Sequence, residues 1–187
     1  MRNTRTLSPC PSGQETVSGF CYLAFQLLFL PSLLFWCNGQ LSSPLNDAEL
    51  NFVFYMINFI AMLVIFHDFL GRSMAQAFRH PVTLFEAVIL GFVAYYACRY
   101  VTQAVIRLLV PTFTNYSDSS IAAMRQGNAF LVLIGTTVLV PPFEECMYRG
   151  LIFRNLYKKN HLAAYLISIL AFSAIHIIGY IGLYSPV

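Results

Sequence analysis

Five long apolar stretches, each separated from the next by a short polar gap, constrain this chain more than any other feature. They cover residues 17–37, 50–70, 84–110, 128–157 and 162–184. About 20 consecutive apolar residues cross the hydrocarbon core of a bilayer as a helix. Within lipid, a helix satisfies its own backbone N–H and C=O groups. The pattern therefore predicts about five transmembrane helices.

The composition agrees with this prediction and excludes other classes. Hydrophobic residues make up 58% of the 187 residues and charged residues only 10%, whereas a soluble domain has about 25% charged residues. A net charge of +3 is too small to indicate nucleic acid as a partner. We expect an all-α, polytopic membrane helix bundle, with residues 1–187 forming a single integral membrane domain.

The basic residues predict how the chain is oriented. They gather before the first apolar stretch, between the second and third, and between the fourth and fifth, which lie on one side if all five stretches cross. These residues are Arg2, Arg5, Arg72, Arg79, Lys158 and Lys159. Because cytoplasmic loops carry an excess of Lys and Arg, we expect a cytoplasmic N-terminus and a multi-pass protein of the cell membrane.

A charged cluster interrupts the fourth apolar stretch. Glu144, Glu145 and Arg149 follow Pro141 and Pro142 directly. An ionisable residue at the centre of a membrane helix costs roughly 2.5–3.5 kcal/mol on insertion scales and marks a functional site by default. The two prolines are expected to kink or interrupt the helix before the glutamates.

The spacing of the cluster assigns a different role to each carboxylate. Glu145 and Arg149 are four residues apart, so on a helix they share a face and form an ion pair. Glu144 and Tyr148 share the next face, about 100° away. Because Glu144 lacks the arginine, we expect it to be free to move protons as a general base.

A second candidate group lies in the last apolar stretch. His176 follows Phe172 at a spacing of four residues, on one helix face. A neutral histidine exchanges a proton, orients a water molecule or binds a metal. Since the fourth and fifth helices are consecutive and antiparallel, Glu144 and His176 are expected to meet across a shared cavity.

Each of these features has a purely structural alternative. The pair of Glu145 and Arg149 can act as a clamp within the bundle, and His176 can simply hydrogen-bond a neighbouring helix. The proline break directly before the glutamates favours a polar site over these alternatives.

Together the residues resemble a known family pattern. Pro-x-x-Glu-Glu-x-x-x-Arg-Gly, followed by Phe-x-x-x-His on the next helix, resembles the CPBP family of intramembrane proteases, which includes CAAX prenyl endopeptidases and bacteriocin-processing or self-immunity proteins. The matching positions are Pro141, Glu144, Glu145, Arg149, Gly150, Phe172 and His176.

The resemblance implies an intramembrane endopeptidase of the bacterial cytoplasmic membrane that cleaves membrane-associated peptides or proteins. Glu144 would activate a water molecule, His176 would assist, and Glu145 with Arg149 would shape the site. The resemblance leaves metalloprotease and metal-free glutamate chemistry open. A divalent metal such as zinc would take Glu144 and His176 as ligands, but a zinc site wants three protein ligands. Self-association also stays open.

The chain departs from the family pattern after His176. That pattern continues with a further helix bearing His-x-x-x-Asn or Asp, whereas this sequence ends at Val187, eleven residues later. We therefore expect weak or no proteolysis by this chain alone. A non-catalytic bacteriocin-immunity or partner-binding membrane protein is the first alternative, and a small proton-coupled transporter subunit is the second.

Overall fold

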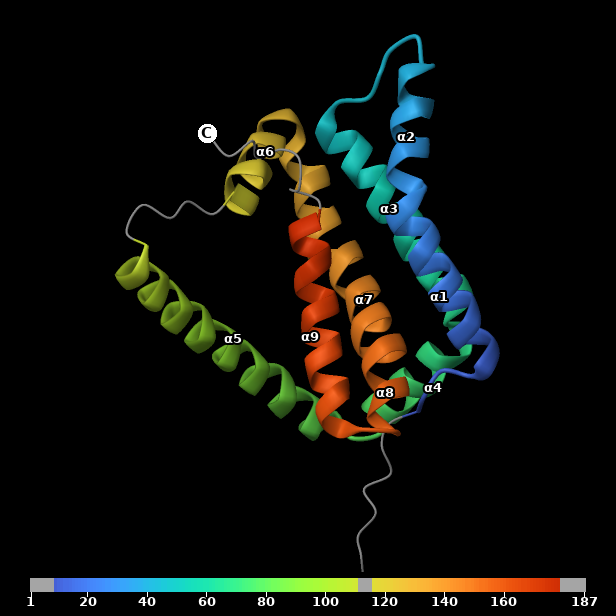
Figure 1. The fold of residues 1–187 in the computed structure, drawn as a ribbon, viewed down its shortest axis with the longest axis vertical. Helices are drawn as coiled ribbons and strands as arrows, with labels where there is room; N and C mark the ends of the chain where they lie inside the picture. The colour runs from blue at the N-terminus through green and yellow to red at the C-terminus, as the bar shows by residue number, and fades with distance from the viewer. Residues whose placement is uncertain (1–8, 111–115, 179–187) are drawn as a thin grey trace, which may run out of the picture.

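The structure is a computed structural model that describes residues 9–110 and 116–178. Every regular element in those two ranges is helical (Figure 1), which confirms the all-α prediction. The helices are α1 (Gly13–Leu28), α2 (Leu30–Gly39), α3 (Asp47–Ile65), α4 (His67–Phe78), α5 (Pro81–Leu109), α6 (Tyr116–Ile134), α7 (Val140–Glu144), α8 (Arg154–Tyr157) and α9 (His161–Ile178). Two π-helical segments, η1 (Gly135–Leu139) and η2 (Glu145–Phe153), flank α7.

The first predicted span is a bent pair of helices. α1 begins at Gly13, earlier than predicted, because Ser12 and Glu15 form a capping box that satisfies the free N–H groups of its first turn. α2 follows after Phe29, with Pro31 in its first turn, and the two helices bend by 48°. As a pair they are long and apolar enough to count as one span.

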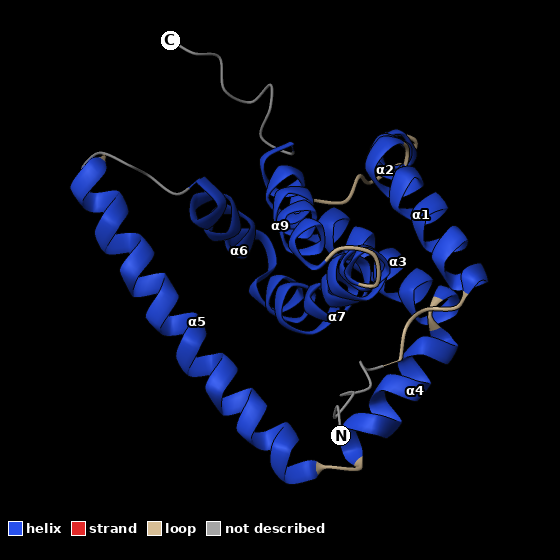
Figure 2. Cartoon of the chain, turned by 60° about the horizontal axis from the view of Figure 1, so that its bottom comes forward, coloured by secondary structure: helices blue, strands red, loops and turns tan. Residues whose placement is uncertain are grey.

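The second predicted span, residues 50–70, extends beyond the end of the observed helix. α3 starts at Asp47, capped by Asn46, and ends at Ile65. Phe66 leaves the helical conformation, and α4 then runs in a new direction (Figure 2). The apolar run continues through the bend because Phe66 and Phe69 are core residues there rather than part of a straight span.

α5 stands apart from the rest of the bundle. It covers 81–109, close to the predicted 84–110, and none of its residues is buried. In Figures 1 and 2 it leaves α4 at one end and diverges from α9 along its length.

The fourth predicted span is a helical stretch from Ile121 to Tyr157. It is kinked at Asn128, whose φ of −154° and ψ of 94° are not helical. The Asn128 Oδ1 atom accepts the Leu131 N–H at 3.2 Å and so caps the second part of the helix. That part begins where the sequence predicted.

The prediction that Pro141 and Pro142 kink or interrupt this helix is wrong, because the two prolines change the type of helix instead. The chain stays helical through both prolines and widens into π-helical turns on each side. Val140 donates its N–H to the Gly135 carbonyl, five residues back. Since proline has no N–H to donate to the fourth residue back, the neighbouring turns take up the longer spacing instead of breaking.

The fifth predicted span, 162–184, corresponds to α9, and its residues 179–184 lie outside the described part of the chain. By length and apolar character, three described helices can cross a membrane, or four if α1 and α2 form one span. α9 is a shorter apolar helix. Several such helices in one bundle make this a membrane protein.

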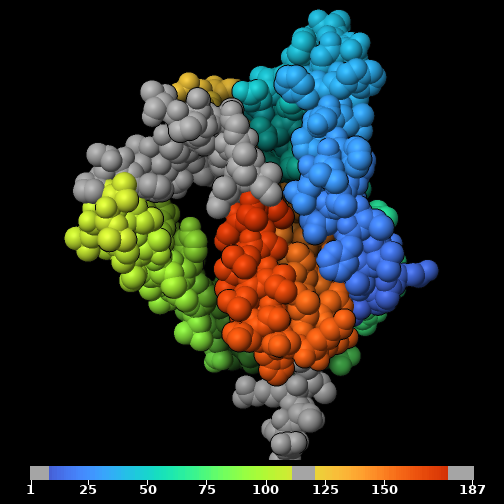
Figure 3. Space-filling view, viewed as in Figure 1, coloured from blue at the N-terminus to red at the C-terminus, as the bar shows by residue number. Residues whose placement is uncertain are grey.

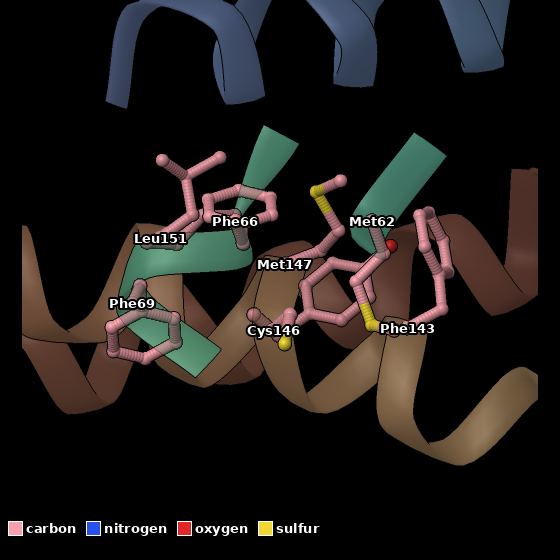
Figure 4. Close-up of a cluster of buried hydrophobic side chains, with 9 residues drawn as sticks. Met62, Phe66, Phe69, Phe143, Cys146, Met147 and Leu151 are labelled. Atoms are coloured by element: carbon pink, nitrogen blue, oxygen red, sulfur yellow. The ribbon is translucent and has the colours of Figure 1, made fainter. Parts of the chain in front are cut away.

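The core lies where α7 and η2 meet the end of α3 and the start of α4 (Figure 4). Its buried side chains are Met62, Phe66, Phe69, Phe143, Cys146, Met147, Tyr148, Leu151 and Ile152. α1 packs closely against this core at Gly19, where an added Cβ would lie 2.7 Å from the Phe66 ring. α9 covers η2 and α8 on another side (Figure 3). η2 is therefore held between helices from both ends of the chain.

Some of the basic residues lie at the end of the bundle where α8 and α9 meet, called the basic end below (Figure 1), whereas Arg99 and Arg107 lie on α5 and Arg125 lies on α6. α4, which carries Arg72, and the turn with Lys158 and Lys159 lie there. Arg72 also donates to the Cys10 carbonyl at 3.3 Å. Arg2 and Arg5 lie outside the described residues, and the cytoplasmic orientation of the N-terminus stays a prediction.

Candidate functional site

The Glu144 carboxylate and the His176 ring face each other. Glu144 ends α7, and His176 lies near the end of α9, the helix that packs on η2. The Glu144 Oε1 and His176 Nε2 atoms are 3.6 Å apart, and the two side chains are 28% and 50% exposed. The structure thus brings together the two residues that the sequence expected to meet.

A backbone hydrogen bond orients the histidine ring. The His176 Nδ1 atom lies 2.8 Å from the Phe172 carbonyl oxygen. A carbonyl oxygen only accepts, so Nδ1 carries the proton, and in the neutral ring Nε2 is an unprotonated acceptor. That acceptor faces a carboxylate, which also accepts. The two groups need a proton, a water molecule or a cation between them.

Aromatic packing fixes the same ring from the side. The Phe172 ring lies 4.4 Å from the His176 ring, centroid to centroid. The Tyr148 ring meets Phe172 edge-on, at 5.1 Å and 86°. The sequence placed Tyr148 on the face of Glu144 without a role. Only the packing of α9 on η2 shows that it supports the histidine.

Glu145 and Arg149 form the predicted ion pair beside the site. Glu145 Oε2 and Arg149 Nε are 3.4 Å apart, and their side chains are 59% and 75% exposed. No described residue joins this pair to His176 by a hydrogen bond or ion pair. Charged groups at membrane depth face protein or a wet cavity rather than lipid. The exposed pair therefore indicates a polar, water-accessible surface next to the site.

The far side of α7 rests on a polar contact that sequence reasoning missed. The Tyr22 hydroxyl of α1 donates to Asn58 Oδ1 of α3 at 2.9 Å. Asn58 is only 3% exposed. The Tyr22 ring also packs edge-on against Phe143 at 6.4 Å, one residue before Glu144. An asparagine within an apolar helix was the signal that pointed to such a contact.

The described residues do not by themselves make a zinc site. His176 has the orientation of a metal ligand, since its other nitrogen donates to a carbonyl. Glu144 supplies a second donor. The described part of the chain holds no cluster of three or more His, Cys, Asp or Glu side chains that fits a metal ion, and a catalytic zinc takes three protein ligands.

One family model matches the part of the chain that carries the site. Residues 126–186 match the family model described as type II CAAX prenyl endopeptidase Rce1-like. The match covers about a third of the chain and includes Glu144, Glu145, Arg149, Phe172 and His176. No curated protein and no solved structure matches this chain.

Proposed function

We propose that this chain, whose match over residues 126–186 supports membership of the CPBP family, is an intramembrane endopeptidase that cleaves membrane-associated peptides or proteins. One observation carries the proposal: Glu144 and His176 come from two different motifs and two different helices, yet their Oε1 and Nε2 atoms lie 3.6 Å apart. A structural clamp does not need an oriented histidine acceptor opposite a carboxylate.

The geometry supports a general-base mechanism. A water molecule between the two side chains donates one hydrogen bond to His176 Nε2 and one to Glu144. As the water oxygen attacks the peptide carbonyl carbon, its proton passes to the Glu144 carboxylate. When the intermediate collapses, the C–N bond breaks and the protonated Glu144 returns that proton to the leaving amine. The products are a carboxylic acid and an amine.

The exposed pair of Glu145 and Arg149 shapes the polar surface next to the site in this proposal. It keeps water and a polar peptide backbone available next to an otherwise apolar helix. A bilayer and a membrane-bound peptide or peptide precursor are the partners. The basic end of the bundle faces the cytoplasm, and the protein crosses a bacterial cytoplasmic membrane several times.

Cleavage by the full chain in proteoliposomes tests the proposal. Peptides anchored in the same membrane serve as substrates, and mass spectrometry identifies the cut bonds. Glu144→Gln and His176→Asn should each lower the cleavage rate by about 10²–10⁴-fold, the contribution of a positioned general base. Glu86→Gln and His161→Gln are matched controls, because both residues are exposed and lie outside the site.

Two results would contradict the proposal. Cleavage that persists in both site variants would reject catalysis by this pair. Bacteriocin protection of cells that survives both substitutions would instead assign the chain a non-catalytic binding role.

A further inference from the structure

Tyr148 is a buried hydroxyl-bearing residue beside the site that the mechanism above leaves unused. It lies in η2, four residues after Glu144, and is 5% exposed. Buried tyrosines normally give their hydroxyl a hydrogen-bond partner. No described residue forms a hydrogen bond with this one, although such partners are found for Tyr22 nearby.

The Tyr148 ring is held on the side of the site that faces α9. Its edge-on contact with Phe172 and the contact of Phe172 with His176 form a continuous aromatic series. The ring therefore has little freedom to turn away from the Glu144–His176 pair.

The hydroxyl itself is not sealed in the core. Among the described residues, the enclosed side-chain polar atoms that lack a partner are Gln26 Oε1 and Ser73 Oγ, and the Tyr148 hydroxyl is not one of them. It is therefore not completely enclosed. Tyr148 follows Glu144 by four residues along the same helical segment, so its side chain lies on the side of η2 that carries the Glu144 carboxylate. A hydroxyl donor without an acceptor among the described residues therefore belongs to the same helix face as the candidate base.

We propose that the Tyr148 hydroxyl donates a hydrogen bond to the carbonyl oxygen of the scissile peptide. This rests on the proposed endopeptidase function. While the water oxygen bonds to the carbonyl carbon and Glu144 takes the water proton, the C=O π electrons move onto oxygen. The Tyr148 O–H stabilises that oxyanion and keeps its own proton. Collapse re-forms the C=O bond and expels the amine with the proton from Glu144.

Tyr148→Phe separates the hydroxyl from the ring. Loss of one oxyanion donor costs about 10²–10³-fold in kcat, so Tyr148→Phe should lower kcat by that factor, with KM and thermal stability close to wild type. Tyr148→Leu should lower both kcat and thermal stability because it also removes the contact with Phe172. Tyr165→Phe is the control, since Tyr165 is a tyrosine of α9 that packs against Phe153 and not against Phe172.

The outcomes separate this assignment from the proposed function. Full cleavage by Tyr148→Phe, with cleavage lost in Glu144→Gln, would overturn the oxyanion role and leave the endopeptidase standing. Full cleavage by Tyr148→Phe with loss in Tyr148→Leu would assign Tyr148 a packing role only. A wild-type chain that cleaves none of the anchored peptides would overturn both.

Discussion

Two buried polar side chains, Glu15 and Asn58, each join helices that are distant in the sequence. Glu15 is 5% exposed and accepts the N–H groups of Ser12 at 2.6 Å and Phe69 at 2.7 Å. Its carboxylate also lies 3.5 Å from Arg72 Nη2. Because Phe66 gives α4 no side-chain cap, Glu15 caps that helix from across the bundle and ties α1 to it.

Removing the Glu15 carboxylate should therefore loosen one end of the bundle. Glu15→Ala removes the acceptor of the Ser12 and Phe69 N–H groups, and the Phe69 N–H is buried. An unsatisfied buried group costs about 1–3 kcal/mol. We expect a clear drop in the thermal unfolding midpoint in detergent, and a smaller drop for Glu15→Gln, which keeps an acceptor. Gln14→Ala, next to it and exposed, is the control. An unchanged midpoint in Glu15→Ala would refute the capping role.

At the scale of elements, the turns around the two prolines decide where the site residues point. η1 precedes Pro141 and Pro142, and η2 carries the cluster from Glu145 onward. π-helical turns are rare in proteins, and those that occur are often found at functional sites. A wider turn rotates every later side chain relative to a plain α-helix, so the direction of Glu144 depends on η1.

Replacing both prolines tests that dependence. Pro141→Ala with Pro142→Ala restores two N–H donors, and an interior proline costs a helix about 3 kcal/mol or more. We expect a higher unfolding midpoint together with reduced peptide cleavage, because a regular helix turns Glu144 away from His176. Pro31→Ala is the matched control, since Pro31 occupies the first turn of α2, where proline is tolerated. Unaltered cleavage in the double variant would show that η1 does not set the site.

At the scale of the whole molecule, packing is concentrated around η2 and is absent along α5. Leu151 is fully buried among α1, α4 and η2 side chains, whereas Leu90 on α5 is 67% exposed. In a membrane the helices associate through close packing and not through a difference in polarity from the lipid tails. Stability should therefore come from the compact part of the bundle.

Two leucine truncations compare these parts. Leu151→Ala should cost about 2–5 kcal/mol, as buried leucines do, while Leu90→Ala should change stability little. Thermal unfolding in lipid nanodiscs measures both. A cost for Leu90→Ala as large as that for Leu151→Ala would mean that α5 is packed, and a second copy of the chain would then be the partner to look for.

Much of the architecture could be predicted because membrane helices carry a strong local signal. The apolar runs located α5 and the second part of the fourth span closely, and the spacing of Glu145 and Arg149 predicted their ion pair. The wrongly predicted helix ends are those that tertiary packing determines. The end of α3 at Ile65 follows from core packing of Phe66, which no hydropathy pattern distinguishes from a continuing span.

The sequence by itself determined the helical class, the charged cluster and the identity of the candidate pair, because these depend on composition and on spacing along one helix. Tertiary structure decided the distance between the two side chains, their orientation and their packing. The 3.6 Å approach of Glu144 to His176, the ring orientation set by Phe172 and the support from Tyr148 all require α9 to pack on η2. Contacts between helices depend on their relative rotation. π-helical turns flank Glu144 on both sides, and residue spacing alone does not encode how they rotate its side chain.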